Sequence, residues 1–149
     1  MTDSAQQLAK FLEGQYMGIH AYDHFIQNMD DAYLKQELQH IQQDLKSQAS
    51  RVAARIQELG GNPPDNLGIG GQIQEWVSEL KGFPASPEGI LRMALKGEDK
   101  YGIHRAHEEI HGKLDEQSAA LIDDVFKRSK AHVDKLQLLL EHLSAAERL

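Results

Sequence analysis

All four prolines fall in two short segments, and this confinement limits what the rest of the chain can form. The first segment, 60–71, contains Pro63 and Pro64 among five glycines, and the second, 82–87, contains Pro84 and Pro87. Proline breaks helix interiors, and dense glycine marks turns. Outside the two segments, apolar residues recur at three- and four-residue steps, which predicts long helices rather than strands.

Four long helices and one short helix follow from this spacing. The long helices are expected over residues 4–29, 31–59, 86–114 and 116–143, and the short helix over 73–80. Asp30 or Asp31 is suited to cap the second helix, Gly60 to end it, and Pro87 to occupy the first turn of the third. Each long helix has roughly seven turns and a length of about 40 Å.

The lengths of the connections predict the topology. The first two helices and the last two are joined by short links, so each pair forms an antiparallel hairpin. The middle connection, 60–86, can cross the length of a bundle. Two hairpins joined by one long crossover that contains a short helix is the ferritin-like arrangement. The sequence therefore predicts an all-α, ferritin-like four-helix bundle as a single domain over residues 1–149.

Composition excludes several classes of function. The absence of cysteine removes disulfides and thiolate chemistry, and the net charge of −7 argues against nucleic-acid binding. No apolar run is long enough to span a membrane, and the first residues lack the pattern of a secretory signal. These features predict a cytoplasmic protein.

Several short motifs carry a resemblance to a known family. They are Gly18-x-x-x-Tyr22, Met29-Asp30-Asp31-x-x-Leu34-Lys35, Leu59-Gly60-Gly61-Asn62-Pro63, Gly97-Glu98-Asp99 and Ala131-His132-Val133-Asp134. With these motifs the chain resembles the small bacterial ferritin-like domains of unknown function, which are distantly related to rubrerythrin. The resemblance extends over nearly the whole chain. It implies a non-haem di-iron or di-manganese site at the bundle centre, with ferroxidase, peroxidase or oxygenase chemistry.

A dinuclear site in this fold needs one Glu from each of two helices and a Glu-x-x-His pair from each of the other two. The string occurs at Glu37–His40 and at Glu108–His111, and the second occurrence lies on the third helix rather than the fourth. A helical wheel places Glu37 at the edge of the apolar stripe and His40 outside it. We therefore expect the first pair to be solvated.

Polar residues nevertheless occur on the predicted inner faces. His132 lies in the centre of the apolar stripe of the fourth helix, preceded by Ser129 and Arg128 where a ligand Glu would be needed. The complete inward set is Gln15, Tyr22, Gln48, Glu98, Tyr101, Arg105, Glu108 and His132. Arg105 could neutralise Glu98 or Glu108.

Two interpretations of this inward set remain open. The favoured one is a metal-free hydrogen-bonded network that fixes the register of the helices, with no cofactor. The alternative is a site for iron, manganese or zinc. Its candidate ligands are Glu98, Glu108 and His132, with Glu37, His40 and His104 as weaker candidates.

Other residues bear on surface and packing. His20 and His24, and the string His104, His107 and His111, are expected mostly on outer faces. Glycines inside the helices (Gly14, Gly18, Gly97, Gly102 and Gly112) suggest close helix approach or a local bulge. Apolar residues flank the core stripes: Met17, Phe25, Trp76, Val133 and Leu138. They suggest a surface covered in a homo-oligomer, most simply a dimer.

The leading functional hypothesis is a non-enzymatic ferritin-like bundle with a structural or stress-related role. The competing hypothesis is a metal-dependent redox protein of ferroxidase or peroxidase type, acting on a substrate that the sequence does not identify.

Overall fold

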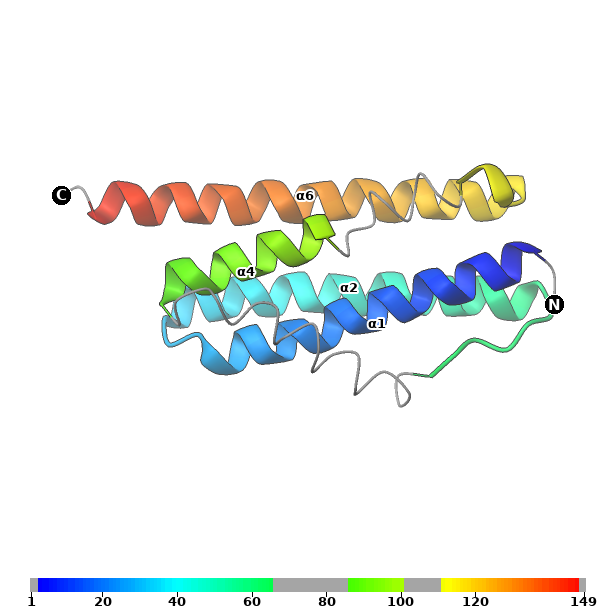
Figure 1. Cartoon of the computed structure of the whole chain (residues 1–149), viewed down its shortest axis with the longest axis horizontal. Helices are drawn as coiled ribbons and strands as arrows, with labels where there is room; N and C mark the ends of the chain where they lie inside the picture. Colours follow the sequence, from blue (N-terminus) through cyan, green and yellow to red (C-terminus); the bar gives the residue numbers. More distant parts are fainter. Residues whose placement is uncertain (1–2, 66–85, 101–110, 148–149) are drawn as a thin grey trace.

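In the computed structural model, the chain is described over residues 3–65, 86–100 and 111–147 (Figure 1). These ranges contain the α-helices α1 (Asp3–Asn28), α2 (Ala32–Glu58), α4 (Pro87–Lys100) and α6 (Glu116–Glu147). One turn of 3-10 helix, η2 (His111–Lys113), precedes α6. Within them there is no strand, so the prediction of an all-α fold is confirmed.

The ends of α2 follow the predicted capping residues. Of the two candidate N-caps, Asp31 takes the role, because its Oδ1 accepts the backbone N–H of Leu34 at 2.9 Å. At the other end, Gly60 has φ 82°, and the N–H groups of Gly60 and Gly61 bond to the carbonyls of Gln57 and Ile56. This is a Schellman motif, which needs a left-handed residue that glycine adopts without strain.

The third predicted helix differs from the structure at its end. Pro87 begins α4 as expected, and the Ser86 hydroxyl accepts the N–H of Gly89 at 3.1 Å. However, residues 111–113 form a 3-10 turn rather than the end of an α-helix that reaches Leu114. The reason is local: Asp115 caps α6 by accepting the N–H of Ser118, so the chain must leave helical geometry just before it. Residues 101–110 and the predicted short helix at 73–80 lie outside the described ranges.

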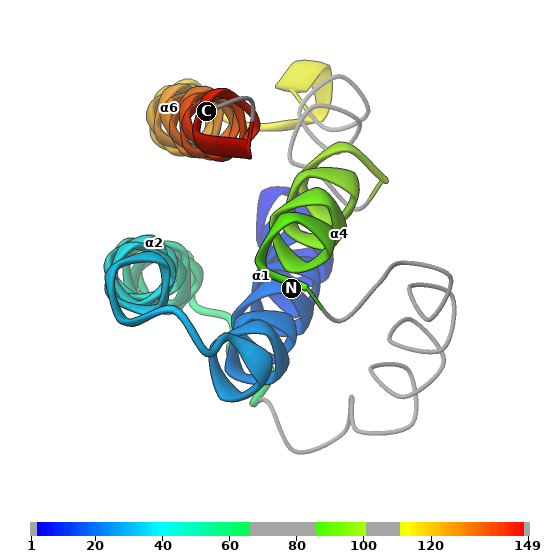
Figure 2. The ribbon, with the colours of Figure 1, turned by 90° about the vertical axis from the view of Figure 1, so that its left-hand side faces the viewer.

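The helices form two hairpins packed side by side. An end-on view shows α1 beside α2 and α4, and α6 beside the same two, so α1 and α6 lie diagonally across the bundle (Figure 2). Figure 1 shows that α2 ends and α4 begins at opposite ends of the bundle. This is the predicted topology of two hairpins with one long crossover, and the ferritin-like fold is confirmed.

The core is apolar and is contributed by all four helices. Its most buried side chains are Leu8, Leu12, Phe25, Met29, Leu38, Val52, Ile56, Ile90, Leu91, Ile122 and Leu136. Phe25 is only 1% exposed, so the expectation that it lies on an outer surface is wrong. It lies three residues after Tyr22 on the same helix face, and the two rings meet edge to face at 5.3 Å.

The helical glycines also differ from expectation. A Cβ atom placed on Gly14, Gly18 or Gly112 would meet no described atom within 4 Å. Close approach of a described helix therefore does not explain these three glycines, and no described residue requires a glycine at Gly14 or Gly18.

Candidate functional site

Glu98 forms a buried polar cluster that joins three helices; we call Glu98, Tyr22 and Ser129 the Glu98 cluster. From α1, the hydroxyl of Tyr22 donates to Glu98 Oε1 at 3.3 Å. From α6, the hydroxyl of Ser129 donates to Glu98 Oε2 at 3.0 Å. Tyr22 and Ser129 are 3% and 6% exposed, so both donor residues are buried, whereas Glu98 is partly exposed. The cluster fixes the end of α4 against α1 and α6.

The electrostatics of this cluster favour a neutral carboxyl group. Burial raises the pKa of Glu98 to about 7, although the hydrogen bonds from Ser129 and Tyr22 act in the opposite direction. Burial and the Glu98 charge likewise raise the pKa of Tyr22 well above its usual value. Among the described residues, no cationic side chain pairs with Glu98. A proton is therefore the simplest group that neutralises it.

A second cluster lies between α2 and α6; we call Asp44, Gln48, Arg128 and His132 the Asp44 cluster. His132 Nε2 lies 2.8 Å from Asp44 Oδ2, and Arg128 Nη1 lies 3.1 Å from Asp44 Oδ1. Gln48 also donates to Oδ1, at 3.2 Å. Here a carboxylate has a cation beside it and several donors, unlike Glu98.

The protonation of His132 follows from its partners. Because the Asp44 carboxylate can only accept, Nε2 carries the ring proton and Nδ1 is left as an acceptor. Burial lowers the pKa of His132, the Asp44 charge raises it, and Arg128 lowers it again. Nδ1 is buried and has no hydrogen-bond partner in the described structure.

The Asp44 cluster is the centre of a longer row of charged contacts, which we call the α2–α6 seam. Its other contacts are Glu37–Lys135 at 3.2 Å, Arg51–Asp124, and Arg55 to Asp115 at 3.1 Å and to Ser118 at 3.0 Å. As the α2 partner moves from Glu37 to Arg55, the α6 partner moves back from Lys135 to Asp115. The seam therefore sets the antiparallel register of these two helices.

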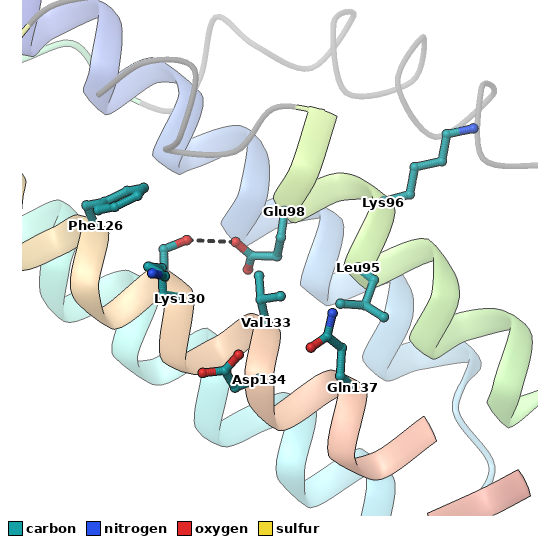
Figure 3. Close-up of a pocket in the computed structure, with 9 residues that line it drawn as sticks. Leu95, Lys96, Glu98, Phe126, Lys130, Val133, Asp134 and Gln137 are labelled. Atoms are coloured by element: carbon teal, nitrogen blue, oxygen red, sulfur yellow. Dashed lines mark hydrogen bonds between the residues drawn. The ribbon is translucent and has the colours of Figure 1, made fainter. Parts of the chain in front are cut away.

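A cavity opens between α4 and α6 beside Glu98 (Figure 3). It has a volume of about 450 Å³. The residues that line it are Leu95, Lys96, Glu98, Phe126, Ser129, Lys130, Val133, Asp134 and Gln137. Its walls are mixed, with three large apolar side chains and a buried carboxyl group.

Of the six predicted ligands, the four that the structure describes are not gathered at one place. Glu98 and His132 both lie inside the bundle, but they belong to different hydrogen-bond clusters. Glu37 pairs with Lys135 on the seam, and His40 is exposed as the wheel predicted. Glu108 and His104 lie outside the described residues, as do Tyr101 and Arg105.

A dinuclear iron or manganese centre in this fold needs several carboxylates and two histidines at fixed helix positions. On α6, Ser129 occupies the position three residues before His132 where a ligand Glu is required. The Glu98 cluster contributes one carboxyl group and two hydroxyls. Across the described ranges no group of three or more His, Asp or Glu side chains could hold a metal ion. The described donors therefore do not fit a dinuclear centre.

Sequence reasoning missed Asp44 and treated Ser129 only as a missing ligand. Both are polar residues at the edge of an apolar stripe, where a wheel cannot distinguish solvation from pairing with another helix. One signal was present: Glu37, Asp44 and Arg51 recur every seven residues on α2, which places charge along one helix face.

The outer histidines of α1 are less exposed than predicted. His20 and His24 are both half-buried, and Nε2 of His20 is buried without a described partner. His20 Nδ1 lies 3.8 Å from Asp23, and the His24 ring lies edge-on to Phe25 at 6.3 Å. Packing against neighbouring side chains, which a wheel of one helix omits, accounts for the difference.

Comparison with known proteins gives a family and a fold. The family described as "Domain of unknown function (DUF2383)" matches residues 3–112. Among solved structures, the chain is similar to ferritin-like, diiron-carboxylate proteins from Bacillus anthracis str. Ames, with a TM-score of 0.67 and 20% identity. The match covers 91% of this chain and 94% of that one. No curated protein matches. Of the described helices, none has the length and apolar character needed to cross a membrane.

Proposed function

Because the chain belongs to the DUF2383 family and has a ferritin-like fold, we propose that it is a non-enzymatic, structural bundle whose polar centre fixes the register of its helices. The observation that supports this proposal is the Glu98 cluster. A carboxyl group that receives two hydroxyl hydrogen bonds, and whose raised pKa favours a bound proton, is suited to hold helices together. Ionised carboxylates, in contrast, are the ligands that hard metal ions need.

We further propose that the bundle self-associates in the cytoplasm as a dimer through the α2–α6 face. Tyr33 and Leu138 are 58% and 46% exposed, unusually high for large hydrophobic residues. Tyr33 lies one turn before Glu37, and Leu138 lies one turn after its partner Lys135, so both flank the same ion pair. A second copy could cover this apolar surface.

Sedimentation tests the dimer directly. We expect the wild-type protein to sediment as a dimer at micromolar concentration and Leu138→Glu to sediment as a monomer. The control is Gln43→Glu, which adds the same charge at an exposed position of α2. Leu143→Glu would not serve, because Leu143 packs on the core. A wild-type monomer would contradict the proposal.

A metal-dependent redox function is the second candidate, and one observation favours it. His132 donates through Nε2 to a carboxylate and keeps a buried, unpartnered Nδ1, an arrangement that metal-binding histidines commonly show. The similar Bacillus anthracis proteins are described as diiron-carboxylate proteins. Iron, manganese or zinc would then use Glu98, His132 and Glu108, acting in ferroxidase or peroxidase chemistry.

Metal content distinguishes the two candidates. Protein purified at neutral pH without a histidine tag is expected to contain iron and manganese far below one ion per chain, with no difference between wild type and Glu98→Gln. Stoichiometric metal that is lost in Glu98→Gln, Glu108→Gln and His132→Ala, but retained in the control His24→Ala, would reject the structural proposal and support the redox function.

A further inference from the structure

The cavity between α4 and α6 has the size and composition of a small-molecule site. Its volume of about 450 Å³ lies within the range in which small ligands and cofactors bind proteins. Three apolar side chains, Leu95, Phe126 and Val133, contribute to its walls. In Figure 3, Leu95 and Gln137 approach one another from α4 and α6 at one side of the cavity, and Phe126 lies at the other.

Charge is distributed unevenly within the cavity. The buried polar group is the carboxyl of Glu98, held in place by Ser129 and Tyr22. The other charged lining residues described, Lys96, Lys130 and Asp134, are exposed. Figure 3 shows the Lys96 side chain extending away from the cavity. A ligand that enters fully therefore meets a carboxyl group and apolar walls.

We propose that this cavity binds a small organic ammonium ion, with the charged nitrogen paired to Glu98 and an apolar body against Leu95, Phe126 and Val133. Glu98 lacks a cationic partner among the described residues, and an ammonium group supplies one. The resulting charge-assisted hydrogen bond is roughly twice as strong as a neutral one. Phe126 adds an aromatic surface at the same cavity.

Anionic and neutral ligands of the same shape fit the site less well. A carboxylate would lie beside Glu98 and Asp134, and Lys130 could approach it only from the exposed rim. An alcohol could donate a hydrogen bond to Glu98 but would bring no positive charge to the carboxylate. Compounds that share one apolar body and differ only in the head group therefore show whether the cavity prefers a cation, an anion or a neutral group.

The probes are phenethylamine, phenethyl alcohol and hydrocinnamate, titrated into the full chain with nuclear magnetic resonance detection in buffer containing a chelator. We expect phenethylamine to bind at least tenfold more tightly than the other two at pH 8, with signals shifting on α4 and α6. We expect Glu98→Gln to reduce phenethylamine binding to the level of the alcohol. Because Gln keeps the shape of the neutral side chain, the variant should fold, and circular dichroism checks this.

Two further variants keep the test decisive. Asp134→Asn, on the exposed rim, should change phenethylamine binding less than twofold, and Val133→Phe should weaken the amine and the alcohol alike by filling the cavity. The proposal is overturned by hydrocinnamate binding more tightly than the amine, by equal binding of all three probes, or by a loss in Asp134→Asn that exceeds the loss in Glu98→Gln.

Discussion

Two polar clusters share helix α6, but the carboxyl groups at their centres have different kinds of partner. Ser129 and His132 are one turn apart, but Ser129 belongs to the Glu98 cluster and His132 to the Asp44 cluster. Among the described residues Glu98 has only hydroxyl donors, and its pKa is raised to about 7. Asp44 has an arginine, an imidazole and an amide beside it. Burial without a described cation favours the protonated form of Glu98, whereas Asp44 lies in a row of ion pairs.

The two clusters also differ in what they contribute to the bundle. In the Glu98 cluster, Tyr22 and Ser129 are buried, and Glu98 lies between them and the cavity, so the cluster is both packed and hydrogen-bonded. The α2–α6 seam is partly open to solvent: the Arg51 and Asp124 side chains are 43% and 44% exposed. Water screens such pairs, so the seam should set register more than it sets stability.

The largest expected effect is at Tyr22. Tyr22→Ala removes a ring that is 3% exposed together with the hydrogen bond to Glu98, and should cost about 3–5 kcal/mol of unfolding free energy. Tyr22→Phe is the matched control, because it keeps the ring and loses the hydroxyl, at a cost of about 1 kcal/mol. Urea denaturation of both variants measures the difference. Equal costs would mean that the ring is not part of the packed core.

The second largest effect is expected in the pH dependence of stability, which should differ between the two clusters. The pKa of Glu98 is raised from its ordinary 4.5 to about 7, so its contribution is fully present below pH 4.5 and is lost as pH rises through 7. At about 1.4 kcal/mol per pKa unit, the loss is about 3 kcal/mol. Glu98→Gln should remove this slope and Glu37→Gln, on the seam, should keep it. Urea midpoints from pH 4 to 8 test this, and parallel curves for wild type and Glu98→Gln would contradict it.

His132 should show the opposite pH behaviour and a smaller mutational effect. Burial lowers its pKa, so its contribution is present above its ordinary value and is lost as pH falls through the lowered one. His132→Ala leaves a cavity and removes a donor to Asp44, at a cost of about 1–3 kcal/mol at pH 7. Thermal or urea unfolding measures it. A cost near zero would show that Asp44 is satisfied by Arg128 and Gln48 alone.

The smallest loss of stability is expected at the exposed Arg51–Asp124 pair of the seam. Arg51→Ala breaks the exposed pair with Asp124 and should cost less than about 1 kcal/mol, with the cost shrinking in about 0.5 M salt. Denaturation at low and high salt measures both. A loss above 2 kcal/mol that is insensitive to salt would show that the seam behaves as a buried network.

Sequence reasoning reached the fold because the deciding signals are local. Asp31 and Gly60 mark the ends of α2, and the apolar stripes together with the long middle connection favour two hairpins. Phe25 was misplaced because a wheel drawn from the stripe of one helix ignores its neighbours. Of the central residues, Glu98, Tyr22 and His132 were identified as inward, but which side chains pair with one another was not predicted. Asp44 comes from another helix, and only the axial register of α2 against α6 determines which side chains meet.

The central claim is that Glu98 is protonated below about pH 7, far above the usual range of a carboxyl group, and infrared spectroscopy tests this most directly. The carbonyl stretch of a buried protonated carboxylic acid should be present at pH 6, absent in Glu98→Gln, and lost with a midpoint near pH 7, consistent with the raised pKa. The same titration in the presence of a chelator should be unchanged. A Glu98 that is ionised throughout this range, or whose protonated signal emerges only after a metal ion is removed, would contradict the account.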